Sequence, residues 1–215
     1  MRIFLLARHG QSLFNVAGVV NSDPRRDRGL SQQGIAESER LRGQIDPIGL
    51  DLLIVSPFPR AVQTANIALE GRRIPREVDE DLGDVRLGDL EGWTIARYRA
   101  HKRQGDRDTA FPNGESLNDA ARRYARSFER LLARDERVTL IVCHEIPVRY
   151  AVNAAKGSAE LDGPLHEVAN AAPYVFDDAA LRRSVDRIRE LADAEPTHPE
   201  PRQGDESART GRSGH

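Results

Sequence analysis

Three apolar runs most strongly constrain what this chain can fold into. They are Ile3–Ala7, Leu50–Val55 and Val138–Cys143, and none of them shows a sustained alternation of apolar and polar residues. A strand with one face in water would show that alternation, so these runs predict strands that are covered on both faces. A further strand is expected at Ala172–Phe176. Helical segments separate the runs, which predicts an α/β fold: a three-layer α/β/α sandwich around a mainly parallel central sheet.

Helical periodicity predicts the elements between these strands. Ser31–Ile45 begins with a residue that suits an N-cap, and Pro59–Leu69 begins with a proline that a first helical turn tolerates. The most regular pattern is Leu117–Arg134, where Ser116 and Asp119 resemble a capping box. The remaining helices are expected to begin near Pro147 and to include Leu181, Val185, Ile188 and Leu191.

The length of the chain suits one domain. A chain of 215 residues can bury a substantial core, and two ordinary domains would need more. We place the domain at residues 1–192. From Asp193 onward the chain is rich in proline, glycine and charged residues and almost free of apolar ones, so residues 193–215 are expected to be disordered.

The overall charge and the single cysteine limit the expected partners and compartment. A formal net charge of −2 creates no basic field, so nucleic acid is not an expected partner. No apolar stretch has the length of a membrane span or of a secretory signal. Cys143 is the only cysteine, which excludes an intramolecular disulfide and suits a reducing compartment, so we expect a cytoplasmic location. Its place inside an apolar run predicts a core thiol and not a nucleophile.

Polar side chains that can bind or attack phosphate follow the three apolar runs. Arg8-His9-Gly10 follows the first run, Ser56–Arg60 the second and His144-Glu145 the third. Ligands of open α/β sheets bind beyond the carboxyl ends of the strands, so these segments are expected to meet in one site. Arginine suits phosphate because its planar guanidinium donates two hydrogen bonds at once and stays ionised. A neutral imidazole can attack phosphorus and form phosphohistidine, and nearby arginines favour the neutral form.

Phosphoryl transfer also needs a proton for the leaving group. A carboxylic acid that burial keeps protonated can supply it, and the candidates lie in the acidic stretch Asp79–Gly92. Spacing alone does not choose among them. Glu115 is expected to help start the helix that follows it, because a negative charge is favoured there. No metal site and no other cofactor are expected, since the remaining histidines show no ligand spacing: His101, His166, His198 and His215.

An ordered set of motifs resembles the histidine phosphatase superfamily, which has the phosphoglycerate mutase-like fold. Leu6–Ser12, with its Arg-His-Gly (RHG) motif and with Asn15 behind it, resembles the family's signature. The set covers about residues 1–177, and its order along the chain is the family's order. The other segments that carry the resemblance are Gly29–Gly34, Ser56–Ala65, Asp81–Gly92, Pro112–Ser116 and Leu140–His144.

The resemblance implies a role for each matching position. His9 would be the nucleophile that becomes phosphorylated. Arg8, Arg60 and His144 would bind the phosphoryl oxygens, and Asn15 would assist nearby or hold its own loop through side-chain hydrogen bonds. No metal ion takes part in the chemistry that the family implies.

Two positions depart from the family's usual pattern. Asp84 falls where relatives usually have a glutamate proton donor; it is one methylene shorter, and its reference pKa is lower. Glu145 follows the second histidine, where small residues are common, and a carboxylate that faces phosphate would be repulsive. We expect Glu145 either to point away from the site or to share proton transfer with Asp84.

Two basic stretches bear on the substrate. Arg25, Arg26 and Arg28 follow the nucleophile motif and could reach the far end of an anionic substrate. The second stretch lies in the insertion at about residues 93–112, where relatives often place a lid. Solvated surface is the ordinary role of such residues, but several of them at the mouth of the site would indicate a substrate with negative charge beyond its phosphate. Its members are Arg97, Arg99, Lys102, Arg103 and Arg107.

These inferences favour one function over two others. The first is a metal-independent phosphomonoester hydrolase that acts through phosphohistidine on a small anionic phosphorylated metabolite. The second is a 2,3-bisphosphoglycerate-dependent phosphoglycerate mutase, although the compact segment between the acid stretch and the second histidine favours hydrolysis. The third is a non-catalytic protein that binds phosphorylated ligands. The identity of the substrate and the oligomeric state stay open at this stage, because family membership constrains chemistry more than it constrains the leaving group.

Overall fold

A five-stranded sheet forms the centre of the molecule in the computed structural model, which describes residues 1–194. The strand order is β3-β2-β4-β1-β5, and every neighbouring pair is parallel except β1 and β5. The predicted α/β fold with a mainly parallel sheet is therefore confirmed. The strands are β1 (Ile3–Arg8), β2 (Leu52–Val55), β3 (Arg76–Val78), β4 (Val138–Cys143) and β5 (Pro173–Asp177).

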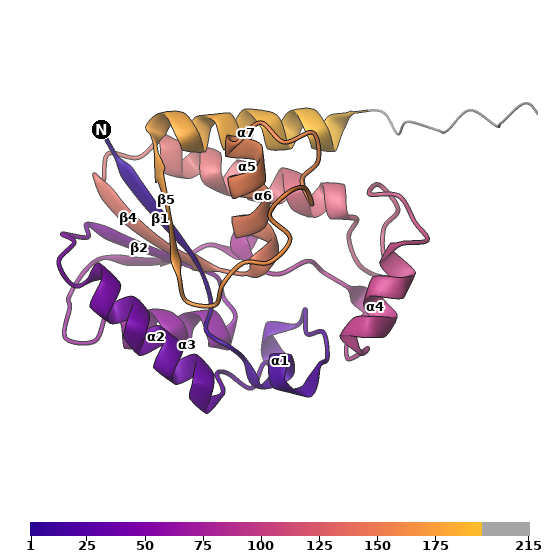
Figure 1. The fold of residues 1–215 in the computed structure, drawn as a ribbon, viewed down its shortest axis with the longest axis horizontal. Helices are drawn as coiled ribbons and strands as arrows, with labels where there is room; N and C mark the ends of the chain where they lie inside the picture. The colour runs from indigo at the N-terminus through magenta and orange to yellow at the C-terminus, as the bar shows by residue number, and fades with distance from the viewer. Residues whose placement is uncertain (195–215) are drawn as a thin grey trace, which may run out of the picture.

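Helices cover both faces of this sheet (Figure 1). One face carries α2 (Gln32–Ile45) and α3 (Pro59–Ala68). The other carries α5 (Leu117–Leu132), α6 (Glu145–Ala155) and α7 (Asp178–Asp193). The shorter helices are α1 (Leu13–Ala17), α4 (Ile95–Lys102) and the 3-10 turns Pro24–Arg26, Glu80–Leu82 and Gly88–Leu90. None of the helices within residues 1–194 is long and apolar enough to cross a membrane.

The apolar runs are buried on both faces because their side chains alternate between two cores. In β1, Phe4 and Leu6 join the core under α5, α6 and α7, whereas Leu5 and Ala7 join the core under α2 and α3. All four are at most 2% exposed. A strand placed in this way has no polar face, which is why its sequence shows no alternation.

The predicted caps are present, and the element boundaries differ by a few residues at most. Ser31 Oγ accepts from the Gly34 backbone N–H at 3.1 Å and opens α2. Ser116 and Asp119 form the reciprocal capping box of α5. The helix expected near Pro147 begins two residues earlier, because His144 is its N-cap. Apart from Asp193, which ends α7, and Ala194, the segment expected to be disordered lies outside the described residues.

The loop after β1 is held in place by a close backbone contact with α2. An added Cβ at Gly34 would lie 2.1 Å from the Gln11 carbonyl oxygen, and one at Gly10 would lie 2.4 Å from the Gly34 carbonyl oxygen. Only glycines allow this approach. The glycine of the Arg-His-Gly motif is therefore needed for packing within the protein, in addition to any approach by a ligand.

We predict that Gly34→Ala lowers the free energy of unfolding by about 1–3 kcal/mol, because the new methyl group overlaps the backbone of Gln11. Gly43→Ala in the same helix is the matched control. Its added Cβ meets no atom within 4 Å, so this change should raise stability by about 0.5–1 kcal/mol. Urea unfolding of the two variants measures both effects, and a destabilisation of equal size in both would contradict the close contact.

Candidate active site

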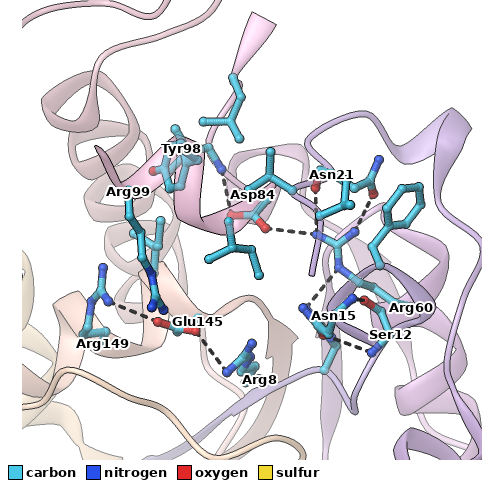
Figure 2. A pocket seen from close by; sticks show the side chains of 18 of the residues that line it. Arg8, Ser12, Asn15, Asn21, Arg60, Asp84, Tyr98, Arg99, Glu145 and Arg149 are labelled. Atoms are coloured by element: carbon cyan, nitrogen blue, oxygen red, sulfur yellow. Dashed lines mark hydrogen bonds and ion pairs between the residues drawn. The ribbon is translucent and has the colours of Figure 1, made fainter. Parts of the chain in front are cut away.

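The segments that follow the parallel strands meet in one pocket at the carboxyl end of the sheet. Five of the predicted residues line it: Arg8, His9, Asn15, Arg60 and Asp84. The sixth, His144, is fully buried behind them and contacts Arg60. Figure 2 shows how Arg8 and Arg60 approach the pocket from different parts of the chain.

His9 is held by its backbone and by its ring. Its N–H continues the β1–β4 ladder by donating to the Cys143 carbonyl at 2.9 Å, and its own carbonyl accepts from Asn170 at 2.8 Å. Ring Nδ1 lies 2.7 Å from the Gly10 carbonyl oxygen, and Arg60 Nε donates to ring Nε2 at 3.0 Å. A carbonyl only accepts and a guanidinium only donates, so the proton sits on Nδ1 and the lone pair on Nε2.

Arg60 is the hub of the site and is 3% exposed. It is the second residue of α3, whose N-terminus is capped from another segment: Asp27 Oδ2 accepts from the Arg60 backbone N–H at 3.0 Å. Arg60 Nη1 donates to Asn21 Oδ1 at 2.7 Å and to Asp27 Oδ2 at 3.2 Å. Arg60 Nη2 donates to Asp84 Oδ2 at 3.0 Å. The guanidinium thus joins four segments that are distant in the sequence.

His144 supports Arg60 from behind. Arg60 Nη2 donates to its Nδ1 at 3.1 Å, so the ring proton is on Nε2, which lies 2.8 Å from Ser56 Oγ. The ring packs against Phe58 and against His9, with ring centroids 4.7 and 5.2 Å apart. The structure brings His144 into the cluster but not to the pocket surface.

Burial and the arginines keep both histidines neutral. Loss of hydration lowers the pKa of His9 well below its usual value of 6.5, and the nearby charges of Arg60 and Arg8 lower it further. Loss of hydration, followed by the charge of Arg60, lowers the pKa of His144 in the same way. A neutral His9 whose Nε2 carries a lone pair is the form that can attack phosphorus, and in this structure that lone pair accepts from Arg60 Nε.

Asp84 stands at the pocket wall, and its pKa is shifted in the opposite direction to those of the histidines. Loss of hydration raises the pKa of its carboxyl group above 3.8, although the charge of Arg60 opposes this shift. Its loop is fixed by Arg123 of α5, which is 3% exposed and donates to the carbonyl oxygens of Asp81, Gly83 and Asp84. Arg123 also pairs with Glu115. Through Arg123, Glu115 therefore helps to hold the loop of Asp84, in addition to preceding α5.

Arg8 and Glu145 form an ion pair inside the pocket. Arg8 Nη1 lies 3.0 Å from Glu145 Oε2 and donates to the Val168 carbonyl oxygen at 2.9 Å, whereas its buried Nε has no hydrogen-bond partner within the described residues. Of the two expectations for Glu145, the one that turns it away from the site is wrong, because it lines the pocket. Its other oxygen accepts from Arg149 Nη1 at 3.1 Å, so each carboxylate oxygen is paired with a different arginine.

Asn15 has a structural contact as well as a place in the pocket. Its Oδ1 accepts from the Ser12 backbone N–H at 3.0 Å in the capping box of α1. A contact with a ligand would therefore use the amide nitrogen. Ser56 belongs to the segment Ser56–Arg60 that was expected at the site, although no role was predicted for it. Asn21 and Asp27 were not predicted as site residues, because they lie in a loop that carries no motif for this contact.

The basic stretches divide between the pocket and the surface. Arg99 and Lys102 of α4 line the pocket, and Arg97 instead stacks on Trp93 with its guanidinium 3.4 Å from the ring centroid. None of Arg25, Arg26 and Arg28 is among the lining residues of this pocket. Cys143 is fully buried, and its burial raises the pKa of the thiol to about 12, so the prediction of a core thiol is confirmed.

Comparison with known proteins agrees with this geometry. A profile described as "Histidine phosphatase superfamily (branch 1)" matches residues 4–191. The chain is 30% identical over 156 residues to the adenosylcobalamin/alpha-ribazole phosphatase of Salmonella typhimurium, covering 67% of this chain and 74% of that protein. It is also 30% identical over 193 residues to a 2,3-bisphosphoglycerate-dependent phosphoglycerate mutase of Methylobacterium radiotolerans, covering 81% and 89% of the two chains. Bacillus stearothermophilus YhfR superposes with a TM-score of 0.73 at 27% identity, covering 82% of this chain and 91% of that chain.

The neutral histidines predict how stability depends on pH. In the unfolded chain a histidine binds its proton near pH 6.5, whereas buried His9 and His144 stay neutral well below that value. The unfolded state therefore binds more protons, and the free energy of unfolding should fall as the pH drops below 6.5, by up to about 1.4 kcal/mol per pH unit for each group. Asp84, with its raised pKa, contributes with the opposite sign at lower pH.

Chemical unfolding at several values between about pH 7 and about pH 5 checks this prediction. His9→Asn should fall less steeply than the wild type, because one titrating group is gone. His166→Asn removes an exposed histidine and should keep the steeper slope of the wild type. Equal slopes in all three proteins would contradict the buried neutral state of His9.

Proposed function

The chain belongs to the histidine phosphatase superfamily, and from that premise we propose that it hydrolyses small phosphomonoesters through a phosphohistidine intermediate at His9. The observation that carries the proposal is the orientation of the His9 ring. The Gly10 carbonyl fixes the proton on Nδ1 and leaves the Nε2 lone pair beside Arg60, where a phosphoryl group would be bound.

Arg8 and Arg60 would hold the phosphoryl oxygens. Buried Arg8 Nε has no partner within residues 1–194, and a phosphoryl oxygen would supply one. Arg60 Nε, which donates to His9 Nε2 in this structure, would donate to a second oxygen and free the lone pair. Asn15 would contribute its amide nitrogen at the pocket wall. We assign His144 to the phosphate-binding residues because its hydrogen bond fixes the orientation of Arg60.

In the first step, His9 Nε2 attacks phosphorus as the bond between phosphorus and the ester oxygen breaks. The Nδ1–H bond to the Gly10 carbonyl stabilises the positive charge that develops on the ring. Asp84 gives its proton to the leaving alkoxide. A general acid of this kind contributes about 10²–10⁴-fold to the rate.

In the second step, water attacks the phosphohistidine. Asp84, now a carboxylate, takes a proton from that water as the phosphorus–nitrogen bond breaks, which releases phosphate and restores both His9 and the acid. Two arginines neutralise the equatorial oxygens throughout, so the proposed mechanism needs neither a metal ion nor another cofactor.

A phosphoglycerate mutase is the second candidate, and the 30% identity to the Methylobacterium radiotolerans enzyme favours it. The first step is the same, but the phosphoryl group returns to a bound intermediate instead of water. The third candidate, a non-catalytic binding protein, has less support because the nucleophile, the arginines and a carboxylic acid lie together in one pocket.

We predict that the protein releases phosphate from phosphomonoesters in EDTA and that His9→Ala abolishes this release. The assay is phosphate release from a panel that includes 3-phosphoglycerate, with His166→Ala as an exposed-histidine control that should keep full activity. Release that persists in His9→Ala would refute the mechanism. If no ester releases phosphate but 2,3-bisphosphoglycerate stimulates isomerisation of 3-phosphoglycerate, the mutase is the correct function.

We predict that Asp84→Asn slows alkyl phosphates by about 100-fold or more, which is the lower range for loss of a general acid. p-Nitrophenyl phosphate should slow much less, because its leaving group needs no proton. Asp89→Asn, an exposed change in the same loop, is the control. Equal slowing of both substrate types would show that Asp84 is not the acid. A Glu145→Gln variant that slows alkyl phosphates much more than p-nitrophenyl phosphate would assign the proton to Glu145.

A further inference from the structure

A cluster of cations forms the wall of the pocket beyond the phosphate site. Arg99 and Lys102 reach it from α4 and Arg149 reaches it from α6. Figure 2 shows Glu145 between Arg8 and Arg149, with the side chain of Arg99 extending toward Glu145. These three cations are not used by the mechanism derived above.

The carboxylates around this wall are too few for its cations. Asp162 alone is shared by three of them: Arg149 Nη2 donates to Oδ1 at 2.7 Å, Lys102 Nζ donates to the same oxygen at 3.2 Å, and Arg107 pairs with Oδ2. Glu145 is shared by Arg149 and Arg8. Two carboxylates therefore face four cations, before Arg99 is counted.

Arg149 and Arg99 have side-chain N–H donors without a partner among residues 1–194. The side chain of Arg149 is only 12% exposed, and its buried Nε has no hydrogen bond among the described residues. The side chain of Arg99 has neither a hydrogen bond nor an ion pair within residues 1–194; it is exposed and lines the pocket. Loss of hydration, together with the charges of Arg149 and Arg107, lowers the pKa of Lys102 against the opposing effect of Asp162. A buried donor without a partner costs stability, and an anion beside Arg149 would satisfy that donor and pair with the exposed charge of Arg99.

We propose that Arg99, Lys102 and Arg149 form a second anion subsite, and that the substrate is a phosphomonoester whose leaving group carries a second acidic group, a carboxylate or a phosphate. This inference rests on the proposed function and narrows its substrate class. The charge of the pocket agrees with it. Five cationic residues and two carboxylates line the pocket, and the cations still outnumber the carboxylates when Asp27 and Asp162, which pair with them from outside the lining, are added.

The position of Glu145 sets the length of such a substrate. Its two oxygens lie 3.0 Å from Arg8 Nη1 and 3.1 Å from Arg149 Nη1. Adding the width of a carboxylate places the two guanidinium groups about 6–8 Å apart, by ordinary hydrogen-bond geometry. A three-carbon skeleton with an acidic group at each end spans that distance.

The test compares three substrates with the same three-carbon skeleton and the same phosphomonoester. They are glycerol 3-phosphate, 3-phosphoglycerate and glycerol 1,3-bisphosphate, which carry a hydroxymethyl group, a carboxylate or a second phosphate at the far end. We expect kcat/KM to be at least about tenfold higher for one or both acidic substrates. Preference for the carboxylate or for the phosphate identifies which group the subsite takes.

The variants locate the preference on the pocket wall. Arg99→Gln should reduce the preference for the acidic substrate about tenfold and change kcat/KM for glycerol 3-phosphate by less than about twofold. Arg99→Lys should restore part of the preference. Arg103→Gln, an exposed change at the end of α4 that does not line the pocket, should leave all three substrates unchanged. Equal rates for the three substrates in the wild type, or an equal loss on all three in Arg99→Gln, would overturn the subsite.

A failure of the proposed function has a different signature. If neither these three esters nor the wider panel of phosphomonoesters releases phosphate, hydrolysis is refuted, and binding of the three compounds to the wild-type protein is then measured by isothermal titration calorimetry. Tighter binding of an acidic compound that is lost in Arg99→Gln would support the subsite without turnover. Equal binding of all three compounds, or no binding of any, would overturn it.

Discussion

The buried guanidinium of Arg60 is the interaction on which the rest of the site depends. A charge that is 3% exposed is tolerated only when it is paired and fully hydrogen-bonded, and Arg60 meets both conditions. Asp27, whose side chain is fully buried, and Asp84 flank the guanidinium, while His9 and His144 accept from its other N–H groups. Its partners come from segments far apart in the sequence, so satisfying this one side chain fixes their relative positions. The contacts that catalysis would use are therefore also the contacts that offset the desolvation cost of burying the Arg60 guanidinium.

The same environment shifts the pKa values of His9 and Asp84 in opposite directions. Loss of hydration disfavours the charged form of any group, so it lowers the pKa of His9 and raises the pKa of Asp84. The charge of Arg60 adds to the first effect and opposes the second. Because Asp84 stands at the pocket wall, its acid form depends on the removal of water, which a bound substrate would extend. One hydrogen-bonded cluster thus favours the neutral form of both an imidazole and a carboxyl group.

The sequence predicts the features whose signal lies within one segment, and it misses those that depend on contact with a distant segment of the chain. The strands β1, β2 and β4 follow from their apolar runs, and α5 follows from its cap and periodic face. Strand β3 has three exposed residues and no apolar run, so only its pairing with β2 makes it a strand. Helix α4 has no buried residue and therefore no amphipathic pattern. In the site, motifs indicated Arg8, His9 and Arg60, whereas the contact of Asp27 with Arg60 arises from a fold that joins residues 33 positions apart.

Glu145 shows how a carboxylate can stand in a phosphate pocket without opposing it. Alone it would repel a phosphoryl dianion, but its two oxygens separate the like charges of Arg8 and Arg149, which would otherwise repel each other across the pocket. Each guanidinium keeps further donors after this pairing, including in both an Nε that has no partner among residues 1–194. Glu145 therefore neutralises only part of the cationic wall and holds its two arginines apart at a fixed spacing. In the proposed subsite, that spacing would convert a general attraction for anions into a preference for a ligand whose two negative groups match the distance between the arginines.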